Sequence, residues 1–161
     1  MIEDKKLCQL IEKLGVHFEQ KEKIAPVAAR IKSYIILNGK KGTTFEELVE
    51  KLCASKSTIS THLTHLQGSN KITYFTKIGD RKKYFILNPD SIIQNIDEMV
   101  STWTHQRDLH SEVKEFKEEM NHDLEKIEKF DLDFHNDYVE FLNQTITSVL
   151  ELRKKLINKN N

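Results

Sequence analysis

A run of short hydroxyl and imidazole side chains between residues 55 and 66 is the part of this sequence best suited to binding chemistry. Read as a helix, the run has one narrow apolar stripe formed by Ile59, Leu63 and Leu66. The opposite face carries the polar residues Ser57, Ser60, Thr61, Thr64 and His65. A solvated helix face usually carries Glu and Lys, whereas Ser, Thr and His suit base edges and phosphates in a DNA groove. The pattern therefore predicts a recognition helix, and Ser55 and Lys56 at its positive end are expected to hold a phosphate.

The residues before this run predict a second helix that supports it. Thr44 and Glu47 have the spacing of a capping box at the start of a helix over residues 45–52. Ser55 is the expected N-cap of the helix that follows. Two short helices joined by about three residues form a helix-turn-helix.

A basic hairpin is predicted directly after the recognition helix. Residues 71–76 and 83–87 are rich in β-branched and aromatic types, which indicates two strands, and residues 78–80 make the turn. Four basic residues lie at the tip and its descending edge: Lys77, Arg81, Lys82 and Lys83. In a winged helix, the arginine is expected to enter a minor groove and the three lysines to contact phosphates. The alternative for the lysines is protection of an exposed strand edge against aggregation.

Helices are predicted on both sides of this region. Apolar spacing indicates helices over residues 2–20 and 26–37. After Pro89 a near-heptad apolar pattern runs for more than 30 residues, is interrupted at residues 130–134, and resumes over 138–156. A stripe of this length exceeds what a small winged domain can cover, so it predicts a partner helix. The alternatives are an intramolecular hairpin and a homodimer that also uses the N-terminal helix. The dimer is favoured because sequence-specific regulators pair their helix-turn-helix units.

The predicted fold class is mainly α (α+β): a winged helix-turn-helix with a two-stranded wing and long N- and C-terminal dimerisation helices. The predicted divisions are an N-terminal dimerisation helix over residues 1–25, a DNA-binding domain over 26–88, and C-terminal dimerisation helices over 89–158.

The charge of the chain is unevenly distributed. Its 25 basic and 25 acidic residues cancel, yet the segment 30–87 holds 11 basic and four acidic residues. A basic middle between acidic flanks is typical of a nucleic-acid-binding module, the alternative being a chance cluster of solvated lysines. Because Lys56 is the only formal charge in the recognition helix, most of the attraction is expected from the wing and from Lys32, Lys40 and Lys41.

No pattern predicts catalysis, a metal or a cofactor. The sequence has no G-x-S-x-G, no glycine-rich nucleotide loop and no H-E-x-x-H, and Cys8 and Cys53 belong to no C-x-x-C pair. His62 falls towards the buried side of its helix and His65 at the edge of the exposed face, so joint metal binding is not expected. No apolar run approaches the roughly 18 residues of a membrane helix, and no signal-peptide core is present. We therefore expect a reduced, cytoplasmic protein that does not contact membranes.

Three parts of the sequence resemble a known family. Residues 44–52 and 54–60 are similar to the helix-turn-helix of MarR-type winged-helix transcriptional regulators. The wing, residues 79–85, and the opening, residues 14–19 and 26–31, look like the GbsR branch of that group. The resemblance implies a homodimeric regulator or repressor that contacts double-stranded DNA through its recognition helix and wing. It also implies that some members respond to a small-molecule effector, which in GbsR is an osmoprotectant precursor.

Two features limit what the resemblance carries over. The family usually has glycine where this chain has Cys53, and cysteine costs about 1 kcal/mol more than glycine if the turn needs a positive φ. No aromatic box for a quaternary ammonium can be assigned, since Trp103, Tyr138 and Phe18 are candidates by type only and are expected to pack. The alternative function is a winged-helix protein-interaction module without DNA binding.

Overall fold

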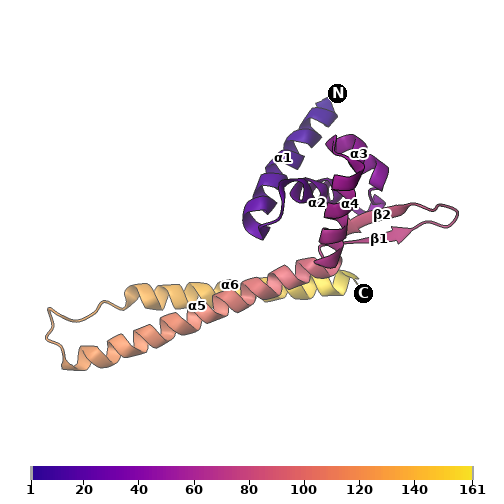
Figure 1. Cartoon of the computed structure of the whole chain (residues 1–161). Coiled ribbons are helices and arrows are strands. Elements are labelled where there is room, and N and C mark those ends of the chain that lie inside the picture. Colours follow the sequence, from indigo (N-terminus) through magenta and orange to yellow (C-terminus); the bar gives the residue numbers. More distant parts are fainter. Residues whose placement is uncertain (1, 161) are drawn as a thin grey trace. The chain divides into compact units, whose positions relative to one another are not determined.

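The computed structural model describes residues 2–160 and is mostly helical with one two-stranded antiparallel sheet (Figure 1). The chain divides into two compact units, of which the first ends at Ser91 and the second begins at Ile92. The first contains α1 (Ile2–Glu22), α2 (Pro26–Asn38), η1 (Gly39–Lys41), α3 (Phe45–Leu52), α4 (Lys56–Gly68), β1 (Ile72–Thr76) and β2 (Lys83–Leu87). The second is formed by α5 (Pro89–Asp123) and α6 (Asp133–Asn160). The predicted winged helix-turn-helix fold class is confirmed.

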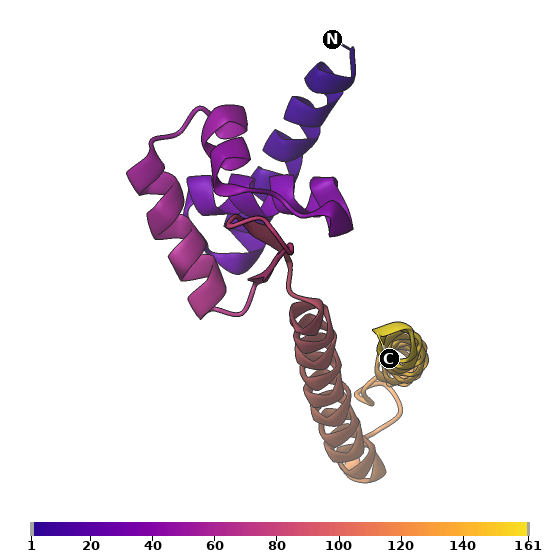
Figure 2. The ribbon, with the colours of Figure 1, turned by 90° about the vertical axis from the view of Figure 1, so that its right-hand side faces the viewer.

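The core of the first unit lies around α2, which packs against α1 and α4. Small residues at Ala28 and Ala29 let neighbouring helices approach closely, and Ile31 and Ile35 fill the space between them. The other elements contribute one or a few buried residues each: Ile11, Leu48, Ile59, Leu63, Leu66, Ile72 and Phe85. Figure 2 shows α4 at the left edge of this unit, connected to α3 by a short turn. The core therefore fixes one side of α4 and leaves the other outside.

The sheet is a hairpin whose base is joined to the start of the helix-turn-helix. Strand β1 pairs with β2 from Ile72 opposite Leu87 to Thr76 opposite Lys83. Thr43 extends this pairing, since its N–H donates to the Phe85 carbonyl at 2.9 Å and its carbonyl accepts from the Phe85 N–H at 2.8 Å. These backbone bonds fix the base of the wing to the segment that leads into α3.

The caps predicted for the helix-turn-helix are confirmed. The Thr44 hydroxyl accepts from the Glu47 N–H, and the Glu47 carboxylate accepts from the Thr44 N–H at 2.7 Å. The Ser55 hydroxyl accepts from the Thr58 N–H at 3.2 Å and so caps α4. Between the two helices Cys53 has a left-handed backbone with φ 49° and ψ 35°. The turn does need a positive φ, which an L-residue with a Cβ adopts at a cost.

We expect Cys53→Gly to raise the free energy of unfolding by about 0.5–1 kcal/mol, because glycine adopts the left-handed conformation without a Cβ clash. Cys53 is exposed, and its sulfur makes one weak contact, 3.6 Å from the Glu50 carbonyl. Urea unfolding measures the change. The matched control is Cys53→Ala, which also removes the sulfur and keeps the Cβ. A glycine variant no more stable than the alanine variant would show that the turn stores no strain.

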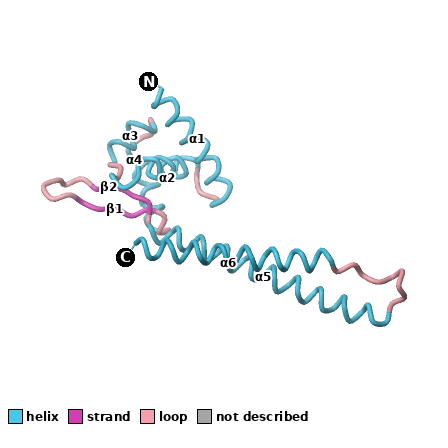
Figure 3. Tube along the Cα trace, turned by 180° about the vertical axis from the view of Figure 1, so that it is seen from behind, coloured by secondary structure: helices cyan, strands magenta, loops and turns pink. Residues whose placement is uncertain are grey.

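The second unit is an antiparallel pair of helices joined by a loop (Figure 3). Asp97 and Arg153 form an ion pair with 2.6 Å between Oδ1 and Nε, and the side chain of Asn121 closes the other end with two hydrogen bonds to the backbone of Phe130. The intramolecular hairpin, which was the alternative to the favoured homodimer, is therefore present within one chain. The second helix starts at Asp133, five residues before the predicted 138.

The faces that meet in this pair differ from the predicted apolar stripes. On α6 the buried residues are His135, Leu142 and Ile146. On the distal half of α5 the residues of the stripe that predicted a partner helix remain exposed: Leu109, Val113, Phe116 and Met120. Periodicity located an apolar stripe there correctly but did not identify its partner. Of the helices that the structure describes, none is both long and apolar enough to cross a membrane.

Candidate nucleic-acid interface

The outward face of α4 carries the side chains that the sequence predicted for it. The apolar stripe formed by Ile59, Leu63 and Leu66 is buried against the core. Ser57, Ser60, Thr61, Thr64 and His65 are all exposed. His62 is half-buried, in agreement with its expected position towards the core. This helix therefore presents a polar face that is free of acidic residues.

The N-terminal end of α4 is exposed but already carries internal hydrogen bonds. The Ser55 hydroxyl lies 2.7 Å from the Thr58 hydroxyl and 3.0 Å from that of Ser57, in addition to its bond with the Thr58 N–H. Ser55 is thus occupied in capping. Lys56 is exposed beside it, so a phosphate at this end would meet an ammonium group and the positive end of the helix.

The lysines of the wing lie over aromatic rings. The Lys77 ammonium is 3.8 Å from the centre of the Tyr84 ring, and the Lys83 ammonium is 4.2 Å from that of Tyr74. A cation above an aromatic face is attracted by the ring quadrupole, which limits the motion of a long side chain. Both lysines are exposed, so the contacts orient their charges without removing them from solvent.

The tip of the wing is ordered by Asp80. Its carboxylate accepts from the Tyr84 hydroxyl at 2.6 Å and from the Lys82 N–H at 2.9 Å, and Gly79 supplies the positive φ of the turn. These hydrogen bonds hold the pKa of Asp80 below its ordinary value. Arg81 and Lys82 follow immediately and are exposed. The sequence predicted Asp80 only as a turn residue, although Tyr84, four residues later, was the available signal for this bond.

The structure corrects the expected sources of charge. Lys32 is buried and forms an ion pair with Glu22, so it does not reach a ligand outside the unit. Lys71 pairs with the same carboxylate, its Nζ lying 2.7 Å from Oε2. Lys40 and Lys41 are exposed as predicted.

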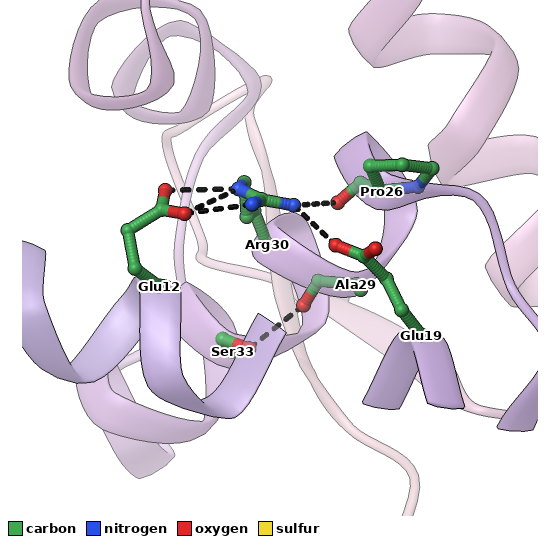
Figure 4. A network of polar contacts seen from close by, with 6 residues as sticks. All are labelled: Glu12, Glu19, Pro26, Ala29, Arg30 and Ser33. Carbon is green, nitrogen blue, oxygen red and sulfur yellow. Dashed lines mark hydrogen bonds and ion pairs between the residues drawn. The ribbon is translucent and has the colours of Figure 1, made fainter. Parts of the chain in front are cut away.

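Arg30 is a further basic residue whose charge is compensated within the unit. Figure 4 shows its guanidinium between Glu12 and Glu19, with Nε 2.8 Å from one Glu12 oxygen and Nη1 2.6 Å from Glu19. Nη1 also donates to the Pro26 carbonyl at 3.0 Å. Arg30 therefore fixes α1 to α2. Within residues 30–87, the exposed basic residues lie on the wing, on η1, and at Lys51 and Lys56.

No family model matches the sequence. The chain is 26% identical over 103 residues to the HTH-type transcriptional regulator MmpR5 of Mycobacterium tuberculosis (strain ATCC 25618 / H37Rv), an alignment that covers 64% of this chain and 62% of that protein. The chain thus spans less than two thirds of the length of this relative. A solved structure described as a transcriptional regulator aligns with a TM-score of 0.52 and 20% identity over 95% of this chain and 99% of its own. The fold is that of a winged helix-turn-helix protein. In sequence, the chain is similar to a transcriptional regulator.

Proposed function

We propose that this protein is a sequence-specific transcriptional regulator of the MarR type, on the GbsR-like branch, that binds double-stranded DNA as a homodimer. The observation that carries the proposal is the exposure, in one unit, of all the residues predicted to contact DNA: Ser55, Lys56, Ser57, Ser60, Thr61, Thr64, His65, Lys77, Arg81, Lys82 and Lys83. Helix α4 would enter the major groove, while the wing would contact phosphates and the minor groove. Repression is the proposed output, and the cytoplasmic location predicted from the sequence belongs to the same proposal.

The homodimer is supported by the composition of the two faces of α5. In the distal half of α5 the face towards α6 is polar, since Arg107 bonds to Asn143 at 3.4 Å and His110 and Lys117 contact His135 at 3.1 and 3.0 Å. Another face of the same helix exposes Leu109, Val113, Phe116 and Met120 at spacings of four, three and four. An apolar stripe left outside a polar intramolecular contact favours a second helix as its partner. A second copy of the chain would also supply the second recognition helix, about 34 Å from the first on a pseudo-palindromic operator.

Arg81→Ala tests the proposed contact of the wing with DNA. We expect weaker binding and a salt dependence whose slope, log K against log salt, is smaller by about one, because one phosphate-neutralising charge is lost. Fluorescence anisotropy over a salt series measures both, on a fragment selected from genomic DNA in the presence of competitor. Lys126→Ala is the matched control, since it removes an exposed charge in the loop between α5 and α6. Unchanged affinity and slope for Arg81→Ala would contradict the wing assignment.

A protein-interaction module is the alternative function. Selection of bound fragments from genomic DNA in the presence of competitor separates the two functions. A DNA-binding regulator should enrich defined fragments against competitor DNA. Enrichment of none would favour the interaction module. The similarity to transcriptional regulators speaks for a regulator and against an enzyme.

A response to a small molecule is a further part of the proposal. It rests on the family resemblance and on the long helices, through which a ligand would change the spacing of the two recognition helices. Small-angle scattering that showed a monomer at micromolar concentration would contradict it, because no spacing would then exist.

A further inference from the structure

Two threonines on the outward face of α4 have their hydroxyl protons engaged inside the helix. The Thr61 hydroxyl donates to the Ser57 carbonyl at 3.0 Å, and the Thr64 hydroxyl donates to the Ser60 carbonyl at 3.0 Å. A hydroxyl has one proton and two lone pairs, so each oxygen can only accept from a neighbouring molecule. Both side chains are exposed. Each therefore presents a methyl group and an acceptor, and no donor.

This combination matches one kind of base pair in the major groove. There adenine offers an amino group that donates, and thymine offers a methyl group and a carbonyl. Guanine offers only acceptors, which would face the acceptor oxygen of threonine, and cytosine has an amino group but no methyl. A side chain with a methyl group and an acceptor is thus complementary to A·T and poorly matched to G·C.

The centre of the helix has no arginine or lysine to read guanine, and its other exposed donors are Ser57, Ser60 and His65. Guanine is read most often by arginine or lysine through paired hydrogen bonds. Between Lys56 and Gln67 the sequence of α4 contains no Arg, Lys, Asn or Gln. Serines 57 and 60 have no methyl group on Cβ and do not provide the same discrimination. A preference for the thymine methyl group in the middle of the helix then depends on the two threonines.

The spacing of the threonines suits neighbouring base pairs. They are three residues apart, which corresponds to about 4.5 Å along a helix axis and places them on one face. Successive base pairs are about 3.4 Å apart along DNA. Helix stability does not explain why threonine occupies both positions, because threonine is a weak helix former. A threonine hydroxyl that bonds to the carbonyl four residues earlier also slightly destabilises a helix.

We propose that Thr61 and Thr64 read the thymine methyl groups of two neighbouring A·T pairs in each half-site. This inference rests on the proposed DNA-binding function and adds the base preference to it. Its test uses the full chain and a selected DNA fragment in which each thymine in turn is replaced by uracil, which removes only the C5 methyl group.

When uracil replaces a contacted thymine, we expect the wild-type protein to bind about fourfold more weakly. This is the effect of losing the burial of one methyl group. Thr61→Ser and Thr64→Ser keep the hydroxyl and lose the methyl, so each should bind the thymine fragment about fourfold more weakly and become insensitive to uracil at one position. Thr147→Ser is the matched control. Thr147 is an exposed threonine on α6 whose hydroxyl donates to the Asn143 carbonyl at 2.9 Å. This variant should keep the wild-type sensitivity.

The outcomes separate this inference from the function on which it rests. If the protein binds DNA and no thymine is sensitive, or if the sensitivity persists in both serine variants, the inference is overturned and the function stands. Selected half-sites with G·C pairs at the centre would overturn it in the same way. If no fragment is bound, the proposed function fails and the inference fails with it.

Discussion

Replacing Glu22 by glutamine is expected to lower the free energy of unfolding by about 3–5 kcal/mol, because it leaves the buried ammonium of Lys32 without its counter-ion. The two side chains are 8% and 5% exposed, and they are joined by an ion pair. Lys71 approaches the same carboxylate, and the ring of Phe18 lies 4.3 Å from the Lys32 ammonium. Solvent therefore has little access to the Lys32 ammonium and would not compensate for the loss of the carboxylate charge. Urea unfolding at neutral pH measures the difference.

We also expect Glu22 to make the free energy of unfolding depend on pH. Burial raises the pKa of Glu22, but hydrogen bonds from Lys32 and Lys71 outweigh it and hold the pKa below its ordinary value. The unfolded chain then binds a proton at higher pH than the folded one. This contribution to stability is complete above the unfolded pKa of about 4.3 and is lost as the pH falls through the folded pKa. In the Glu22→Gln variant, this part of the decrease in the free energy of unfolding at acid pH should be absent.

Two further variants distinguish a buried pair from a surface one. Glu12→Gln removes a carboxylate that is 59% exposed and pairs with Arg30, so it should cost less than about 1 kcal/mol. The double variant Glu22→Leu with Lys32→Met removes both charges together and should recover most of the lost stability. A Glu22→Gln protein within about 1 kcal/mol of wild type would show that the Lys32 ammonium is solvated.

The parts of the fold that were predicted from the sequence depend on short-range patterns. A capping box needs only Thr44 and Glu47, three positions apart, and the stripe of α4 needs only one helical period. Such signals act within a few residues, so one sequence is enough to read them. At Cys53 the sequence left the sign of φ open, and the structure shows that it is positive.

Partners that lie far apart along the chain were not predicted. Each basic residue of the middle segment was counted as free positive charge, whereas Lys32 and Arg30 are compensated by carboxylates of α1, 10 to 18 positions earlier. Nothing in the spacing of charges on two helices shows which of them meet. A charge count therefore overestimated the free positive charge.

Periodicity also failed to assign the partner of each helix face. It assumes that polar residues lie outside, yet His135 is buried between α5 and α6, with its Nδ1 3.1 Å from that of His110 and its Nε2 3.0 Å from the Lys117 ammonium. Leu109, Val113, Phe116 and Met120 of α5 are exposed instead. A stripe shows that a helix has a partner, and only the three-dimensional arrangement shows that α6 covers a different face.

Phe116→Glu is expected to convert the proposed dimer into a monomer at micromolar concentration and to weaken binding to a two-half-site operator by about 100-fold or more. Phe116 is 61% exposed and lies in the middle of the apolar stripe of α5. A carboxylate there would be desolvated in the interface without a counter-ion. Loss of the second recognition helix removes the gain from simultaneous binding of two half-sites, which is about 100-fold or larger. Sedimentation velocity and fluorescence anisotropy measure the two effects.

Ile127→Glu is the matched control for the dimer prediction, because it places the same charge on an apolar residue that is 94% exposed in the loop after α5. It should leave both the oligomeric state and DNA affinity unchanged. Since Phe116 is largely exposed within one chain, its substitution should also leave the helical content and the unfolding midpoint of α5 and α6 near wild type. A Phe116→Glu protein that is still a dimer would place the dimer contact on another surface. A monomer that kept full affinity for the operator would show that a single recognition helix with its wing is sufficient for binding, which contradicts the pairing of half-sites.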